Sequence, residues 1–158
     1  GKSTLLSVIT SARPKIANYK FTTLNPNLGV AVYDDKEITL ADIPGLIEGA
    51  HEGVGLGIKF LKHIERCKIL LHMIDVTEDD LVTSYKQIRN ELKKYSNDLV
   101  KKKEIIVFNK VDLIEKNELK EKIKFFEGKI KKKVSILSNT DKKLISKIKS
   151  SLLGYVFK

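Results

Sequence analysis

Residues 105–112 read IIVFNKVD, an apolar run followed at once by a largely polar one. A short, continuous apolar run beside a polar segment indicates a buried strand, with the polar residues at its carboxyl end. Residues 69–75 and 134–137 form similar runs, and residues 81–95 and 119–130 between them carry apolar side chains at helical spacing. Strands that alternate with helices of this length predict an α/β fold with a mostly parallel sheet covered on both faces.

Further elements are predicted on either side of this pattern. A helix starts at the first residues, a loop spans residues 11–27, and residues 29–33 and 37–41 form a hairpin. A closing helix runs over residues 141–155, and residues 138–140 cap its start. Its predicted inward-facing residues are Leu144, Ile148 and Leu152. Because no linker or repeat interrupts the chain, we expect a single domain over residues 1–158.

The polar run after the middle strand has the pattern N-K-x-D, which selects guanine. Asp112 is expected to accept hydrogen bonds from the ring N–H and the exocyclic amine of guanine, a pair of donors that adenine lacks. The aliphatic stem of Lys110 would cover the face of the base, and Asn109 would tie the base to neighbouring loops. The motif therefore predicts GTP or GDP as the ligand.

The first four residues, Gly1-Lys2-Ser3-Thr4, match the second half of the phosphate-loop motif G-x-x-x-x-G-K-[ST]. In that motif the backbone N–H groups of the loop and of a helix N-terminus hold the phosphates. We expect Lys2 to reach the β- and γ-phosphates and Ser3 to bind Mg²⁺. A tetrapeptide recurs by chance, but in an α/β chain it predicts a P-loop NTPase with three α/β/α layers.

Asp42-Ile43-Pro44-Gly45 follows the second strand of the predicted hairpin. A carboxylate at a strand end suits contact with Mg²⁺ through water, and Gly45 lets its backbone N–H approach the γ-phosphate. Taken alone, the segment is better interpreted as a simple strand-exit turn with proline and glycine. The order and spacing of all three motifs nevertheless predict GTP binding and hydrolysis, and a nucleotide kinase would not need the guanine pattern.

Two longer segments resemble one family of switch proteins. Residues 42–66 read DIPGLIEGAHEGVGLGIKFLKHIER, and residues 17–29 read ANYKFTTLNPNLG. They resemble the second and first switches of the Obg family of GTPases, also called CgtA. The resemblance covers nearly the whole chain and weakens after Asp112. It implies a GTP-hydrolysing switch that binds the large ribosomal subunit, with its RNA, and acts in subunit assembly.

The resemblance also implies roles for single residues. Thr23 would be the switch threonine that closes onto Mg²⁺ and the γ-phosphate, with its neighbour Thr22 as the alternative. Ser135 would be the serine of the last base-contacting loop, with Ser138 as the alternative because the usual Ser-Ala pair and glycine turn are not found. Leu46 stands where many GTPases place a glutamine that orients the attacking water, so slow turnover is expected.

Composition restricts the remaining choices. The formal charge is +10, from 30 basic and 20 acidic residues, which favours a polyanion such as RNA, although solvated lysine-rich faces explain it equally well. The single cysteine, Cys67, favours a cytoplasmic setting, and no apolar run approaches the roughly 20 residues of a membrane helix. We expect a monomer that does not bind DNA, in which His72 is a buried, hydrogen-bonded histidine of a strand.

The chain begins at the sixth residue of the eight-residue phosphate-loop motif. We expect the central first strand and the first half of the loop to be missing from these 158 residues, and hence weak GTP binding and low stability for them alone. An alternative function is a non-catalytic remnant that binds only RNA or a protein partner.

Overall fold

The computed structural model describes residues 1–10, 15–16, 27–33, 35–43 and 64–157. Their contacts form two compact units. The parallel-sheet unit holds Gly1 and residues 69–86 and 103–158, and the hairpin unit holds residues 2–68 and 87–102. Among the described residues, no helix has both the length and the apolar character that crossing a bilayer requires.

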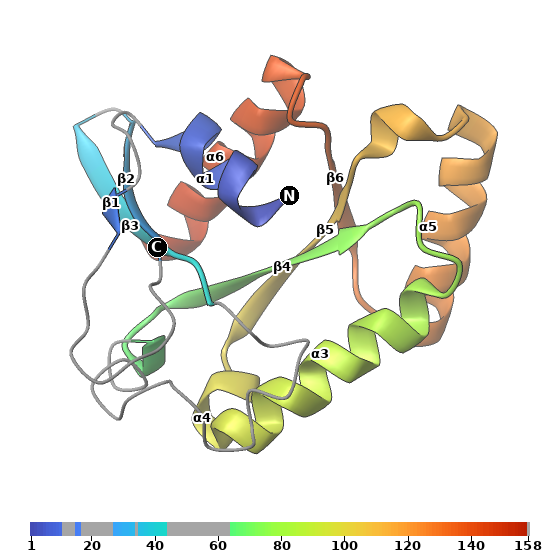
Figure 1. Cartoon of the computed structure of the whole chain (residues 1–158), viewed down its shortest axis with the longest axis horizontal. Helices are drawn as coiled ribbons and strands as arrows, with labels where there is room; N and C mark the ends of the chain where they lie inside the picture. The colour runs from blue at the N-terminus through green and yellow to red at the C-terminus, as the bar shows by residue number, and fades with distance from the viewer. Residues whose placement is uncertain (11–14, 17–26, 34, 44–63, 158) are drawn as a thin grey trace. The chain divides into compact units, whose positions relative to one another are not determined.

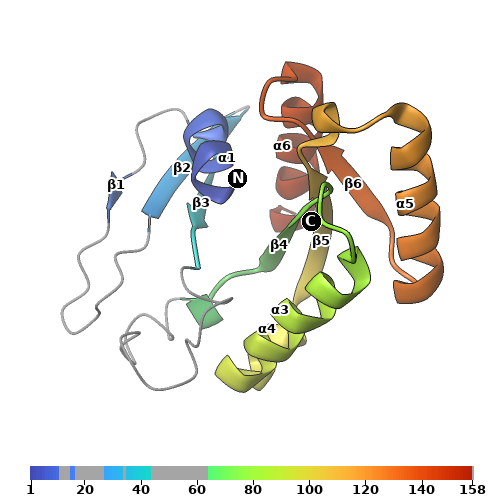
Figure 2. The same ribbon diagram turned by 45° about the vertical axis from the view of Figure 1, so that its right-hand side comes forward.

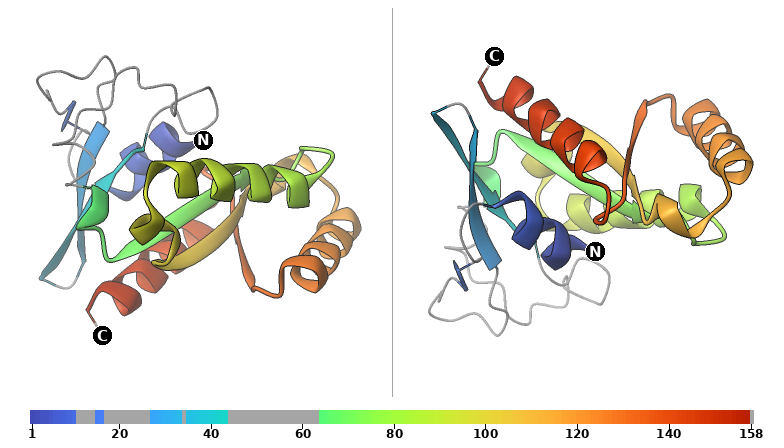
Figure 3. Two further views of the ribbon diagram at one scale, coloured as in Figure 1. Left: turned by 90° about the horizontal axis from the view of Figure 1, so that it is seen from below. Right: turned by 90° about the horizontal axis from the view of Figure 1, so that it is seen from above.

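The parallel-sheet unit is built on three strands in the order β4-β5-β6: β4 (Ile69–Asp75), β5 (Lys103–Asn109) and β6 (Val134–Leu137). Both pairings are parallel, and β4 and β5 lie side by side in Figure 1 and in both views of Figure 3. The register sets Asp75 opposite Asn109, and Asn109 opposite Leu137. The parallel sheet predicted from the alternating pattern is therefore confirmed.

Helices cover both faces of these strands. Helix α5 (Lys116–Ile130) and the first part of α3 (Leu81–Tyr95) lie on one face, and α6 (Lys142–Val156) lies on the other (Figure 2). On the first face, Phe126 of α5 packs edge-on against Phe108 of β5 and Tyr85 of α3, with ring centroids 5.0 and 5.5 Å apart. Phe108 and Phe126 are fully buried, so this aromatic cluster forms the centre of the core.

The start of α6 differs from the expectation. Its N-cap is Asp141, whose Oδ1 accepts hydrogen bonds from the backbone N–H groups of Lys143 (2.8 Å) and Leu144 (3.2 Å). The prediction that residues 138–140 cap the helix is wrong, because the Asp141 carboxylate reaches two free N–H groups at once. Leu144 is only half-buried, and its neighbour Ile145 faces inward with Ile148 and Leu152.

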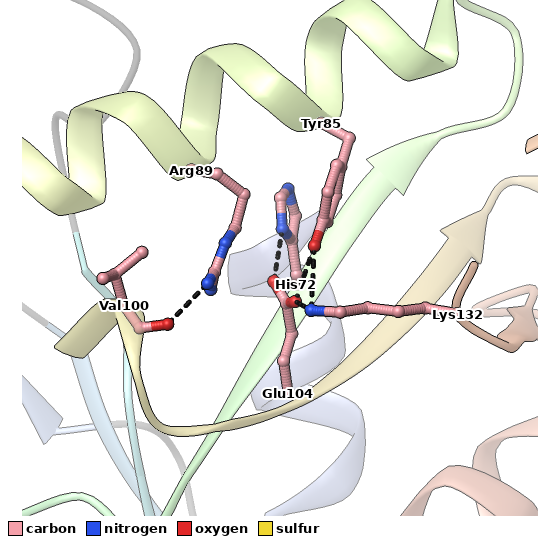
Figure 4. A network of polar contacts seen from close by, with 6 residues as sticks. All are labelled: His72, Tyr85, Arg89, Val100, Glu104 and Lys132. Atoms are coloured by element: carbon pink, nitrogen blue, oxygen red, sulfur yellow. Dashed lines mark hydrogen bonds and ion pairs between the residues drawn. The ribbon is translucent and has the colours of Figure 1, made fainter. Parts of the chain in front are cut away.

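A buried polar network lies on the α3 side of β4 and β5 (Figure 4). Its centre is the Glu104 carboxylate, whose side chain is 2% exposed. Oε1 lies 2.9 Å from Nδ1 of His72, and Oε2 accepts from the Tyr85 hydroxyl (2.9 Å) and the Lys132 ammonium (3.0 Å). His72 also stacks on Tyr85. The buried, hydrogen-bonded histidine predicted for position 72 is confirmed, and its partner is a carboxylate.

The hairpin unit contains α1 (Lys2–Ile9) and an antiparallel sheet in the order β1-β2-β3: β1 (Lys15–Ile16), β2 (Asn27–Tyr33) and β3 (Lys36–Ala41). The predicted hairpin is confirmed, but β1 lies within a segment predicted as loop. Helix α1 packs on β2 so closely that a Cβ atom at Gly29 would collide with the side chains of Thr10 and Leu6. Glycine at position 29 therefore permits the packing.

Two short helices complete the described elements, and neither is anticipated by the apolar pattern. In the hairpin unit, α4 (Asn97–Val100) is capped by Ser96 and buries Leu99 completely. In the parallel-sheet unit, the 3-10 helix η1 (Val111–Leu113) follows β5 directly. Because only Lys110 separates η1 from β5, η1 carries the end of the predicted guanine motif.

Candidate functional site

Polar residues gather at the carboxyl ends of the parallel strands. Asp75 ends β4, Asn109 ends β5, and Ser138 follows the last residue of β6. The strand register sets Asp75 beside Asn109, and Asn109 beside the residue that precedes Ser138. Such an edge is where open α/β sheets bind ligands.

Asn109 is buried and lies against Gly1. A Cβ atom at Gly1 would come within 2.8 Å of Asn109 Nδ2, closer than side chains approach one another. The backbone carbonyl of Asn109 accepts a hydrogen bond from the N–H of Val76. The side-chain Oδ1 of Asn109 is buried with no hydrogen-bond partner in the described part of the chain. Thus the first residue of the phosphate-loop half-motif lies beside the first residue of the guanine motif, and a polar atom there remains available.

Lys110 has a left-handed backbone (φ 64°) and precedes η1. Its ammonium forms an ion pair with Asp75, with Nζ 2.5 Å from Oδ2. The hydrogen bond and the charge of Asp75 raise the pKa of Lys110. Asp112 lies on η1 with an exposed side chain, so its carboxylate is open to a ligand.

Asp75 is a site residue that the motifs do not reveal. Its Oδ1 accepts hydrogen bonds from the backbone N–H (3.0 Å) and the hydroxyl (2.7 Å) of Thr77. Partial burial raises the pKa of Asp75, but the hydrogen bonds from Lys110 and Thr77 lower it by more, so the net pKa is below the usual range. The signal in the sequence was a carboxylate at the end of a buried strand, in the same position as Asn109 on the next strand.

The two candidate serines lie in different places. Ser135 is inside β6, where its register partner is Val107 of β5. Ser138 is buried in the loop after β6, where its Oγ lies 2.8 Å from the Thr140 hydroxyl and accepts from the Thr140 N–H. A serine that contacts the base from the loop after β6 would therefore be Ser138, the alternative to Ser135.

In the hairpin unit, the predicted phosphate lysine meets the predicted metal carboxylate. Lys2 Nζ lies 3.0 Å from Asp42 Oδ1 and donates a hydrogen bond to the Ile43 carbonyl at 3.0 Å. The Lys2 side chain is 52% exposed and that of Asp42 12% exposed, so the ammonium can leave the pair for a ligand without crossing a packed core. Ser3 and Thr4 are exposed on the first turn of α1.

The donor set fits Mg²⁺ held chiefly by a nucleotide and water. Within the described ranges, no group of three or more His, Cys, Asp and Glu side chains could hold a metal ion by itself. Asp42 Oδ1 is buried and, apart from the Lys2 ion pair, accepts no hydrogen bond from the residues that the structure describes. Ser3 offers an exposed hydroxyl. One carboxylate and one hydroxyl oxygen are what Mg²⁺ takes from a protein when phosphates supply other ligands.

Several predicted residues lie outside the described ranges. They are Thr23 and its alternative Thr22, Gly45, and Leu46.

A family model described as "50S ribosome-binding GTPase" matches residues 1–110. The chain belongs to this GTPase family. The "GTPase Obg" of Pelagibacter ubique is 68% identical over 99% of the chain, and that of Rickettsia felis is 53% identical over 94%. These matches confirm the resemblance to the Obg family. The chain spans about half the length of these relatives, 48% and 45% respectively.

The fold of this GTPase family member is shared with more distant proteins. The cytosolic domain of the T. maritima FeoB iron transporter, solved in its GMPPNP form, aligns with a TM-score of 0.69. The alignment covers 100% of this chain and 60% of the other, at 18% sequence identity. Similarity at that identity concerns the fold alone, and it agrees with the predicted P-loop α/β class.

Proposed function

We propose that this chain binds and hydrolyses GTP as a molecular switch in assembly of the large ribosomal subunit. The observation that carries the proposal is the close approach of Gly1 to Asn109. One residue begins the phosphate half-motif and the other begins the guanine motif. The first residues of the two motifs thus lie together in the parallel-sheet unit, which supports recognition of the phosphates and the base of one nucleotide.

The parallel-sheet unit would recognise guanine. The exposed Asp112 carboxylate would accept from the two N–H donors of the base, and the stem of Lys110 would cover the face of the base. Asn109 would hold the neighbouring loops together, and Ser138 would contribute from the loop after β6. Ser135, inside the strand, is the weaker candidate.

The hairpin unit would hold the phosphates. Lys2 would leave Asp42 to neutralise the β- and γ-phosphates, and the N–H groups at the start of α1, from Ser3 and Thr4, would donate to phosphate oxygens. Ser3 and Asp42 would hold Mg²⁺, which neutralises charge on the phosphate oxygens when bound.

The two switch segments would complete the hydrolytic machinery. Thr23 would join the Mg²⁺ ligands on closure, and the Gly45 N–H would approach the γ-phosphate. Because Leu46 has no polar group to orient water, hydrolysis would rest on Lys2 and on ordered backbone donors. We therefore expect slow turnover, as suits a timed switch.

The proposed partner is the RNA of the large ribosomal subunit. The description of the family names the 50S ribosome, and the net charge of +10 suits a polyanion. We further propose that residues 1–158 act as one domain, in a monomer of the cytoplasm that does not bind DNA.

The test compares nucleotides on two proteins: the 158-residue chain, and the same chain preceded by the upstream residues of its 68% identical relative. The extended chain should bind fluorescent GDP and exclude ADP, and should hydrolyse GTP in a single turnover that needs Mg²⁺. Binding of RNA without any GTP hydrolysis would instead support the non-catalytic alternative. Tight GDP binding by the 158 residues alone would contradict the expectation that they bind weakly.

A further inference from the structure

Asp75 and Lys110 come from adjacent strand ends and meet in an ion pair. Asp75 is the last residue of β4, and Lys110 directly follows Asn109, the register partner of Asp75 on β5. The two oxygens of the carboxylate have separate partners. Oδ1 accepts twice from Thr77, and Oδ2 accepts from the Lys110 ammonium.

Thr77 fixes the Asp75 carboxylate independently of Lys110. Two hydrogen bonds from one residue, at 3.0 Å from the backbone N–H and 2.7 Å from the hydroxyl, leave the carboxylate little rotational freedom. The oxygen offered to Lys110 therefore has a set position. An ordinary surface ion pair between two mobile side chains lacks this feature and contributes little.

Lys110 is held at both of its ends. Its backbone is fixed in the left-handed region between β5 and η1, and the Leu113 N–H donates to its carbonyl at 3.0 Å. Its ammonium is fixed by Asp75. A free lysine side chain samples many rotamers, so anchoring the tip confines the methylene stem between two fixed points.

From this geometry we infer that Asp75 is a positioning residue that holds the Lys110 stem in place for the guanine base. The inference rests on the proposed function and adds to it the residue that prepares the base site. A stem that is already ordered loses less entropy when the base docks. Removing Asp75 should therefore weaken binding of the base and leave the phosphates unaffected.

The decisive variant is Asp75→Asn. An asparagine Oδ1 can still accept from Thr77, but its amide group donates and cannot accept from the Lys110 ammonium. The control is Asp80→Asn, because Asp80 also accepts from one threonine, taking the Thr83 N–H on Oδ1 (3.0 Å) and the Thr83 hydroxyl on Oδ2 (2.6 Å). Asp80 belongs to a different polar cluster from Lys110, so replacing Asp80 should leave nucleotide binding unchanged.

The experiment measures GDP dissociation and pyrophosphate affinity on the chain extended upstream as described above. We expect Asp75→Asn and Lys110→Met each to speed GDP release by about tenfold. The double variant should show no further increase, because both substitutions break the same ion pair. Affinity for pyrophosphate, which has no base, should stay unchanged in all variants.

Each other outcome contradicts the inference. If Asp75→Asn releases GDP no faster than Asp80→Asn, Asp75 does not act on the base and the inference alone fails. If Asp75→Asn weakens pyrophosphate binding as much as GDP binding, the substitution acts on the fold and the inference fails. If the unaltered extended chain holds pyrophosphate but not GDP, or holds neither, the proposed function fails and the inference fails with it.

Discussion

Nδ1 of His72 lies 2.9 Å from Oε1 of Glu104, and the two side chains are only 6% and 2% exposed. A carboxylate this deep in the protein is stable only when its oxygens have partners. The partners of Glu104 include His72, Tyr85 and Lys132, which come from β4, α3 and the loop before β6 (Figure 4). The network thereby links the two neighbouring strands to the elements that cover them.

Replacing Glu104 by alanine should therefore cost about 3 kcal/mol of unfolding free energy, because His72 and Tyr85 lose their buried partner. Urea unfolding followed by circular dichroism measures the loss. Glu118→Ala is the control, since Glu118 pairs with Lys122 on the surface of α5 and should cost about 1 kcal/mol or less. Equal losses in the two variants would contradict a special role for the buried carboxylate.

The same network predicts a loss of stability at alkaline pH. Burial raises the pKa of Tyr85; burial lowers the pKa of Lys132, but hydrogen bonds to Glu104 and Tyr85 raise it by more. Both groups bind protons more tightly when folded, so their stabilisation is complete below their unfolded pKa values and is lost as the pH rises through the folded ones. Melting temperature should fall above about pH 10, and Glu104→Gln should reduce the pH dependence. A melting temperature that stays constant up to about pH 11 would contradict this stabilisation by Tyr85 and Lys132.

Asp112→Asn should change which base the protein prefers. An asparagine amide donates where the carboxylate accepted, which suits the C2 carbonyl of xanthine and leaves the guanine amine unpaired. We expect the preference for GDP over XDP to fall by about a hundredfold or more, measured by competition on the extended chain. Asp79→Asn, another exposed aspartate of the same unit, should leave the preference intact.

Gly1→Ala tests the contact between the two motifs. The added Cβ would lie 2.8 Å from Asn109 Nδ2 and force that buried amide to move. We expect GDP affinity to fall by about tenfold, with a stability cost of about 1 kcal/mol. Gly128→Ala on α5 is the control. Apart from its own helix backbone, no described residue lies within 4 Å of an added Cβ, so the change should stabilise the helix by roughly 0.5–1 kcal/mol. Unchanged GDP affinity in Gly1→Ala would show that the contact between Gly1 and Asn109 does not contribute to nucleotide binding.

Much of the fold followed from the spacing of apolar residues. The bounds predicted for β4, α3 and β6 agree with the structure, because α3 repeats its apolar residues at helical spacing and the two strands are short apolar runs. The two-residue β1 is too short to show any period. The cap of α6 was misplaced because four consecutive polar residues, 138–141, are all good caps, and only the backbone decides which of them meets the free N–H groups.

The candidate site could be predicted where a residue belongs to a recognisable motif. Asn109, Lys110 and Asp112 were predicted in this way. Asp75 was not, because its importance depends on parallel register with Asn109 and on the left-handed backbone of Lys110. Neither property is visible in a run of letters. Ser135 was the first choice over Ser138 because the letters alone do not show that β6 continues through Leu137, two residues beyond Ser135.

The packing of α1 on β2 through Gly29 also matters for protein engineering. The helix begins with Lys2 and Ser3, and β3, the partner of β2, leads directly into Asp42. The spacing between the lysine and the carboxylate is thus set by Gly29, Leu6 and Thr10, none of which needs to touch a ligand. A chimera that exchanges the hairpin between relatives should therefore carry its own helix with it, since a new helix on an old strand would change that spacing.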